Sequence, residues 1–285
     1  MAQMSRVEGI SLQWGESLCW DDRRGRLYFV DCVARTLHWL DGVEPPAATL
    51  PMPSIPTAVV PTEDDRLVVA LADGLHAVDP DAGSIELVAR YPDGLGGRAN
   101  DACADLHGNL VTGTLNLELG ARAGSYWWYS TVHGWRRLDD GIGNANGPAV
   151  VERDGTSTLV FADTHAGVLY AYDYDGDAGT VSNRREFART DEFGGMPDGA
   201  CADADGGVWS CIFGAGKIAR FTDGGADEVL DTGASLTSDV TFGGEGMDRL
   251  FFVSLSIGDD SPDAGALMAV EGVGRTGRPE PRVRL

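Results

Sequence analysis

The chain reads Asn-Asp-Ala-Cys-Ala-Asp at residues 100–105, and it reads Asp-Gly-Ala-Cys-Ala-Asp at residues 198–203. In both places a Gly and a short apolar run follow, at 108–111 and at 206–209. A shared four-residue ending with the same flanks in the same register indicates an internal repeat. The polar residues that open the two copies are therefore expected to occupy equivalent places in the structure.

Short apolar runs recur along the whole chain, each after a polar turn rich in Asp, Gly or Arg. They begin at Leu27, Leu67, Leu110, Leu159, Val208 and Leu250. Their spacing of about 40 to 49 residues is that of a four-stranded propeller blade. Several runs are followed by another that ends in an acidic residue, as at 36–41, 74–79 and 168–173. These second runs predict the next antiparallel strand of the same blade, joined by a short hairpin.

The repeats predict an all-β fold, a six-bladed β-propeller with four antiparallel strands in each blade. An open ring would leave two strand edges unpaired, so we expect the N-terminal strand, around residues 6–12, to pair into the last blade. Residues 1–285 are expected to form one domain. The Gly-, Arg- and Pro-rich residues 272–285 are expected to form a surface tail.

The composition limits the classes of partner. The 285 residues include 22 Lys and Arg against 44 Asp and Glu, a net charge of −22. Such a surface repels nucleic acid and anionic membranes, so we expect neither as a partner. No stretch approaches the roughly 18 apolar residues of a membrane span, and the N-terminus lacks the apolar stretch of a secretion signal. The five cysteines include no Cys-x-x-Cys pair and are expected to be free thiols, which is typical of a cytoplasmic protein. We expect the protein to be a monomer or a small homo-oligomer.

Polar residues stand at similar positions in four of the repeats. Glu16, Asn100, Asn146 and Asp198 lie 10 to 13 residues before the apolar run of their repeat. Polar residues placed just before the innermost strands of different blades meet at one end of the central channel. Two carboxylates and two amides at that place suit Ca²⁺, Mg²⁺ or Mn²⁺ and sometimes Zn²⁺. About three protein ligands would leave positions open for water and substrate, which is typical of a catalytic metal.

Four groups of segments have an order and spacing that are specific when taken together. They are Gly15-Glu16-Ser17 with Trp20-Asp21 and 27–31, Arg98-Ala99-Asn100-Asp101 with Gly113-Thr114, Asn146-Gly147 with 171–175, and Pro197-Asp198-Gly199 with Asp203, Gly206 and Trp209. In these segments the chain resembles the gluconolactonase family that includes senescence marker protein (regucalcin), from about residue 16 to about residue 253. The resemblance implies a six-bladed propeller with one divalent cation in its channel.

The resemblance also implies a role for each candidate residue. By this resemblance, the metal ligands are Glu16, Asn146 and Asp198. Arg98 and Asn100 match residues that hold the substrate and an active-site water, and Glu118 matches an acid that contacts the substrate. Asp198 further matches the general base. The chain departs from the family at Ala99, where an aromatic residue is common, and at Ala145, where proline is usual. These departures are expected to alter the pocket wall.

The implied reaction is hydrolysis of an ester within a ring. The metal would polarise the lactone carbonyl, Asp198 would take a proton from the attacking water, and Arg98 would bind substrate hydroxyls or a carboxylate. We therefore expect a metal-dependent, gluconolactonase-like lactonase that acts on a small sugar lactone in carbohydrate metabolism. Two alternatives stay open: a hydrolase or tailoring enzyme of the same fold acting on a non-sugar ester or lactone, and a non-catalytic cation-binding propeller. His165 is a further residue that could approach the pocket.

Overall fold

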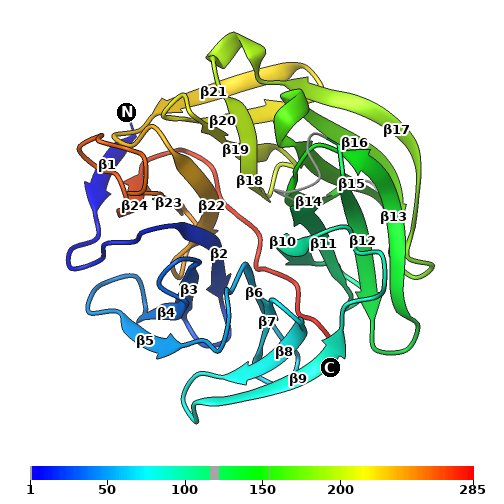
Figure 1. Cartoon of the computed structure of the whole chain (residues 1–285). Coiled ribbons are helices and arrows are strands. Elements are labelled where there is room, and N and C mark those ends of the chain that lie inside the picture. The colour runs from blue at the N-terminus through cyan, green and yellow to red at the C-terminus, as the bar shows by residue number, and fades with distance from the viewer. Residues whose placement is uncertain (1, 116–121, 154) are drawn as a thin grey trace.

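The computed structural model of the chain describes residues 2–115, 122–153 and 155–285. Six four-stranded antiparallel sheets stand around a central channel (Figure 1). This arrangement confirms the six-bladed β-propeller predicted from the repeats. Within the described ranges the remaining regular elements are two short 3-10 turns, η1 (Thr164–Ala166) and η2 (Asp191–Phe193).

Each blade runs from an innermost strand at the channel to an outermost strand at the rim. Blade 1 contains β2 (Gly15–Asp21), β3 (Arg26–Asp31), β4 (Thr36–Asp41) and β5 (Ala48–Pro51), and blade 2 contains β6 (Ala58–Pro61), β7 (Leu67–Leu71), β8 (Gly74–Asp79) and β9 (Ser84–Arg90). Blade 3 contains β10 (Arg98–Ala104), β11 (Leu110–Leu115), β12 (Gly124–Ser130) and β13 (Gly134–Ile142), and blade 4 contains β14 (Ala145–Arg153), β15 (Thr156–Asp163), β16 (Val168–Asp175) and β17 (Thr180–Arg189). Blade 5 contains β18 (Met196–Ala202), β19 (Val208–Phe213), β20 (Lys217–Thr222) and β21 (Gly225–Asp231), and blade 6 contains β22 (Thr237–Gly243), β23 (Arg249–Ser254), β24 (Leu267–Glu271) and β1 (Gln3–Arg6).

The N-terminal strand closes the ring, as expected. It pairs antiparallel with β24 and becomes the outermost strand of blade 6. It lies at Gln3–Arg6, however, and not at 6–12. Gly9 has a φ of +78°, which interrupts an extended run. The apolar residues around it enter the core between blades 6 and 1: Val7, Ile10 and Leu12.

The apolar runs used to count the repeats are the second strands of the blades, β3, β7, β11, β15, β19 and β23. A second strand has a neighbouring blade on each face, so both faces are buried and its sequence is a continuous apolar run. All five residues of β7, for example, are buried. The outer strands are largely exposed and charged, as in β17. The predicted third strands at 36–41, 74–79 and 168–173 correspond to β4, β8 and the first part of β16.

The apolar core of the described residues is divided into six clusters, one at each interface between neighbouring blades. At the interface of blades 3 and 4, the rings of Tyr126 and Phe161 are stacked with centroids 3.7 Å apart. These clusters fix the position of each blade relative to the next. They therefore also fix the relative positions of the innermost strands around the channel.

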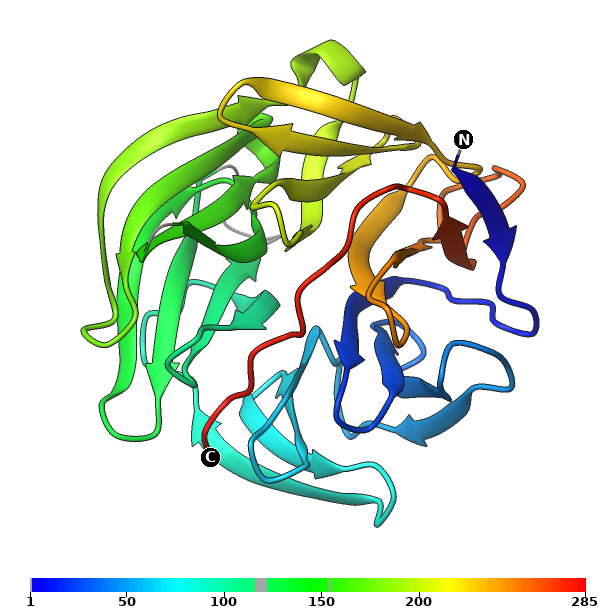
Figure 2. The same ribbon diagram turned by 180° about the vertical axis from the view of Figure 1, so that it is seen from behind.

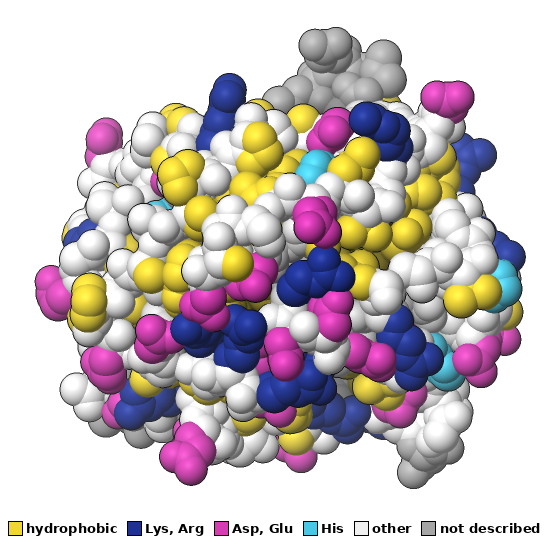
Figure 3. Space-filling model, turned by 90° about the horizontal axis from the view of Figure 1, so that it is seen from below, with side chains coloured by type: hydrophobic (Ala, Val, Ile, Leu, Met, Phe, Trp, Pro, Cys, Tyr) yellow, Lys and Arg dark blue, Asp and Glu magenta, His cyan; other side chains and the backbone are white. Residues whose placement is uncertain are grey.

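The acidic net charge is spread over a mixed surface. On the face shown in Figure 3, the Lys and Arg side chains lie among Asp and Glu side chains. Many form ion pairs, such as the one between Arg26 and Asp81 at 2.9 Å.

None of the described helices has the length and apolar character needed to cross a membrane.

Replacing Phe161 with alanine tests the role of the clusters. Phe161 is fully buried, so we expect Phe161→Ala to lower the free energy of unfolding by about 3–5 kcal/mol, through lost burial and a cavity between blades 3 and 4. Urea denaturation measures this change. Val132→Ala, at a side chain that is 81% exposed, is the control and should change stability by less than about 0.5 kcal/mol. Equal midpoints for Phe161→Ala and wild type would contradict the interpretation.

Candidate active site

The polar residues selected from the repeats meet at one end of the channel. Glu16, Asn100, Asn146 and Asp198 come from the innermost strands of blades 1, 3, 4 and 5, and they line one cavity of about 130 Å³. The other residues that line this cavity are Trp14, Leu115, Asn144, Thr164, His165, Met196 and Phe213. The lining of the cavity thus combines polar and apolar side chains.

These four residues lie on the innermost strands themselves and not before them. Each of the four strands changes its pairing register at this level, in the segments 16–19, 99–102, 146–149 and 197–200. A bulge leaves residues out of the ladder and turns their side chains to a new direction. The bulges and the polar residues interrupt any apolar pattern, which is why the apolar runs identified the second strands.

The repeated Ala-Cys-Ala-Asp motif has the same place in two blades. Ala102 pairs with Thr112 on the second strand of blade 3, and Ala200 pairs with Ser210 on the second strand of blade 5. The polar residue of the site stands two positions before each of these alanines. Asn100 and Asp198 are therefore structurally equivalent, as the repeat indicated.

The two amides of the site are joined to each other. The Nδ2 of Asn100 donates hydrogen bonds to Oδ1 of Asn146 and, at 3.3 Å, to the main-chain oxygen of Ala145. The Nδ2 of Asn146 donates to Oγ1 of Thr164 at 3.0 Å. These contacts fix the orientation of the Asn146 amide and place its oxygen on the side of Asn100.

Of the two carboxylates of the site, Asp198 is buried and Glu16 is half-buried. Burial raises the pKa of Glu16 to about 8, although the indole N–H of Trp14 donates to its Oε1 at 2.7 Å. The pKa of Asp198 lies well above its usual range because of burial and then the negative charge of Glu16. The negative charge of Glu16 thus makes ionisation of Asp198 more costly. A bound cation would offset both charges.

Two further carboxylates lie in the channel beside the site. Asp101 accepts a hydrogen bond from the main-chain N–H of Gly147, on the next blade, at 3.1 Å. Asp239 accepts one from the N–H of Leu18, which is also on the next blade. Both side chains therefore connect the innermost strands of neighbouring blades.

Asp239, which lies beside the site cavity, was not predicted from the sequence, although its spacing gave a signal. Asp239 stands 11 residues before the last apolar run, which is also the offset of Glu16 in the first repeat. The spacing of the sixth repeat therefore indicates Asp239 in the same way as the first repeat indicates Glu16. His165, whose approach to the pocket was an open question, follows β15 in η1 and lines the cavity.

Arg98 begins β10 beside the site. Its positive charge lowers the pKa of Glu16, though less than burial raises it. Ala99 and Ala145, the departures from the family pattern, are buried between blades and are not among the residues that line the cavity. Glu118 lies outside the described residues.

The donors at the site fit a hard divalent cation. They are the carboxylate oxygens of Glu16 and Asp198 and the amide oxygen of Asn146, and oxygen donors suit such ions. In the described part of the chain, no group of three or more His, Cys, Asp or Glu side chains is arranged to hold a metal ion. The five cysteines are free, and burial raises the pKa of each thiol.

Comparison with known proteins identifies the family. Residues 14–256 match the SMP-30/Gluconolactonase/LRE-like region. The chain is 30% identical to pentonolactonase XacC of Haloferax volcanii over 298 residues, 99% of each chain. It is 31% identical to 6-deoxy-6-sulfogluconolactonase of Pseudomonas putida over 244 residues, 84% of this chain and 82% of that one. A crystal structure of regucalcin from Agrobacterium tumefaciens, a calcium-binding protein, has a TM-score of 0.90 and 26% identity and covers 98% of this chain and 97% of its own. The chain therefore belongs to the SMP-30/gluconolactonase/LRE-like family.

Proposed function

We propose that this protein is a divalent-metal-dependent lactonase that hydrolyses a small sugar lactone of the aldonolactone type to its hydroxy acid. The observation that carries this proposal is the meeting of Glu16, Asn146 and Asp198 in one cavity, with Asn100 and Arg98 beside them. The similarity to a pentonolactonase and to a sulfogluconolactonase supports the class of reaction and substrate. The similarity to a calcium-binding regucalcin supports the cation.

Glu16, Asn146 and Asp198 hold the cation in this proposal. When bound, it polarises the lactone carbonyl and stabilises the negative charge that develops on the carbonyl oxygen. Asp198 accepts a proton from the attacking water as the water oxygen bonds to the carbonyl carbon. This proton is then available to the ring oxygen when its bond to the carbonyl carbon breaks. The products are one hydroxyl group and one carboxylic acid, which accounts for every atom of lactone and water.

The neighbouring polar residues orient the reactants. Asn100 holds the attacking water near Asp198 in this proposal, since both residues line the same cavity. The planar guanidinium of Arg98 binds hydroxyl or carboxylate oxygens of the substrate. Glu118 contacts the substrate in the same proposal. Holding the reactants in this geometry lowers the entropic part of the barrier.

One observation favours a second class of substrate, a less polar lactone or ester. Trp14, Leu115, Met196 and Phe213 line the same cavity as the polar residues. Met196 and Phe213 are paired across β18 and β19, directly beside Asp198. Apolar lining favours a substrate with an apolar part.

The reaction class is tested by acid release from a panel of sugar γ- and δ-lactones and one aryl ester in weak buffer. Metal-free protein should be inactive and should recover with Ca²⁺, Mn²⁺, Mg²⁺ or Zn²⁺ to rates well above spontaneous hydrolysis. Release from the aryl ester alone would select the second class. No release with any of these ions, from protein that binds one metal ion per chain, would contradict a lactonase.

The role of the general base is tested by Asp198→Asn, which keeps an oxygen for the metal but cannot accept the proton. At saturating metal we expect kcat to fall by about 10²- to 10⁴-fold, while one metal ion per chain still binds. Calorimetry measures the binding, and acid release measures kcat. Asp260→Asn, at an exposed carboxylate, is the control. A wild-type rate in metal-loaded Asp198→Asn would assign the proton transfer to another group.

The stability of the metal-free protein should decrease as the pH rises. The pKa of Glu16 is about 8 in the folded protein against an ordinary value of 4.5, so the unfolded chain loses this proton at a lower pH than the folded chain. The free energy of unfolding therefore falls between these two pH values, and Asp198 acts in the same direction. A divalent cation replaces the protons, so its affinity should rise with pH.

Thermal melting from about pH 5 to about pH 8, with and without metal, tests this linkage. The melting temperature of the metal-free protein should fall across this range, and bound metal should reduce the slope. Calorimetric titration with metal in two buffers of different ionisation enthalpy should show proton release at the lower pH values. A melting temperature that rises with pH in the absence of metal would contradict the prediction.

A further inference from the structure

Residues 275–285, here called the strap, cross one end of the channel (Figure 2). This end is opposite to the candidate site, because Glu280 contacts Ala104 at the end of β10, whereas Asn100 lies near the start of that strand. The strap pairs with the blades by isolated bridges between Gly277 and Asp203 and between Val283 and Thr62. Its arginines form ion pairs with blade residues, between Arg275 and Asp205 at 3.0 Å, between Arg282 and Asp22 at 2.7 Å, and between Arg284 and Glu63 at 2.9 Å. The strap is therefore fixed to blades on both sides of the channel.

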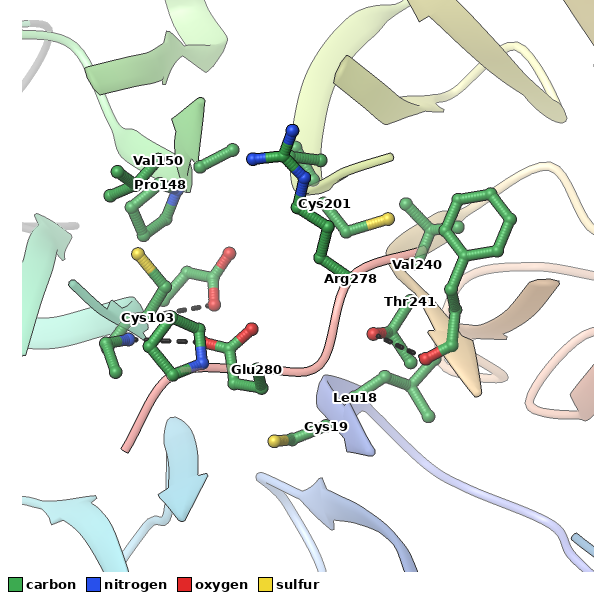
Figure 4. A pocket seen from close by; sticks show the side chains of 18 of the residues that line it. Leu18, Cys19, Cys103, Pro148, Val150, Cys201, Val240, Thr241, Arg278 and Glu280 are labelled. Atoms are coloured by element: carbon green, nitrogen blue, oxygen red, sulfur yellow. Dashed lines mark hydrogen bonds between the residues drawn. The ribbon is translucent and has the colours of Figure 1, made fainter. Parts of the chain in front are cut away.

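A second cavity, of about 100 Å³, lies between the strap and the inner strands (Figure 4). Its lining includes Arg278 and Glu280 of the strap and three cysteines, Cys19, Cys103 and Cys201. Each cysteine stands three residues after a residue of the candidate site, which are Glu16, Asn100 and Asp198 in the same order. The strap thus covers one end of the innermost strands β2, β10 and β18. The site residues Glu16, Asn100 and Asp198 lie towards the other end of these strands.

Glu280 reaches from the strap into this cavity (Figure 4). Its Oε1 accepts a hydrogen bond from the main-chain N–H of Ala104 at 3.1 Å. Ala104 is the last residue of β10, an innermost strand that pairs with another strand only on its outer side. Burial raises the pKa of Glu280 to about 7, but a protonated carboxyl also has an oxygen that accepts. The hydrogen bond is therefore retained whether Glu280 is protonated or ionised.

The strand held by Glu280 connects directly to the candidate site. Asn100 of β10 is hydrogen-bonded to Asn146 of the next blade, and Asp101 accepts from Gly147 of that blade. A displacement of β10 would therefore move both Asn100 and the amide of Asn146. A misplacement of about 1 Å can cost a hundredfold in rate.

We propose that Glu280 is a positioning residue for the site at the opposite end of the channel. Its hydrogen bond to Ala104 fixes β10, and β10 in turn fixes Asn100 and Asn146. Glu280 lines the cavity beneath the strap and is not among the residues that line the site cavity. The kinetic part of this inference rests on the proposed lactonase function, whereas its metal-binding part rests only on the proposed cation site.

Three substitutions separate the hydrogen bond from the charge. Glu280→Gln keeps the length and the acceptor oxygen without the charge. Glu280→Asp keeps the charge but shortens the side chain by one methylene, and Glu280→Met keeps the length without a comparable acceptor. We expect the Gln variant to stay within about twofold of wild type, and the Asp and Met variants to lose about tenfold in kcat and in metal affinity with KM little changed.

Arg284→Ala is the matched control within the strap. It removes an exposed ion pair, which contributes little, and should leave kcat and metal affinity unchanged. Wild-type kcat and metal affinity in both the Asp and Met variants would overturn the proposal. Equal losses in the Gln variant would assign the effect to charge and would overturn it too. If Glu280→Met does not fold by circular dichroism, the comparison of Asp with Gln decides.

Failure of the proposed function is distinguishable from failure of this inference. If wild-type protein hydrolyses no lactone or ester, the lactonase proposal fails. Calorimetric metal affinities of the same variants then still test the positioning role. A weaker affinity in the Asp and Met variants, with wild-type affinity in the Gln variant, supports it, and equal affinities in all of them refute it.

Discussion

The structure depends on hydrogen-bond acceptors for the main-chain N–H groups at the inner edge of each blade. The innermost strand of a closed ring has a neighbouring strand on one side only, and its other edge faces a narrow channel. Main-chain N–H groups on that edge need acceptors, because a buried N–H without one is costly. Side chains supply them here: Asp101 for Gly147, Asp239 for Leu18, Glu280 for Ala104 and Ser17 for Val59. The same contacts hold neighbouring elements together around the channel.

This requirement also shapes the electrostatics of the candidate site. Asp101 and Asp239 accept from main-chain N–H groups, yet their charges still act on the residues above them and raise the pKa of Asp198. Glu16 and Asp198 line the cavity, where a cation and water can reach them. Carboxylates that accept from the backbone and carboxylates that line the cavity thus lie side by side, and burial raises the pKa of all four.

Much of the fold could be predicted because the second strands are buried on both faces. A run such as Leu67–Leu71 is then uninterrupted, and its recurrence gives the number of blades. The innermost strands could not be found in this way, since a bulge and polar residues break their pattern, as in β10. Four site residues were found from spacing and resemblance, because the repeats place them at matching depths. Glu280 could not be found, since its partner Ala104 is 176 residues away and only the course of the strap brings them together.

The strap has a consequence for the traffic of molecules through the channel. With that end covered, a lactone enters and its product leaves by the same mouth, past Trp14, His165 and Met196. The two molecules therefore have to alternate. Ring opening turns a neutral lactone into an anion that has to leave by this mouth. A product that is still bound therefore keeps the next lactone out of the cavity.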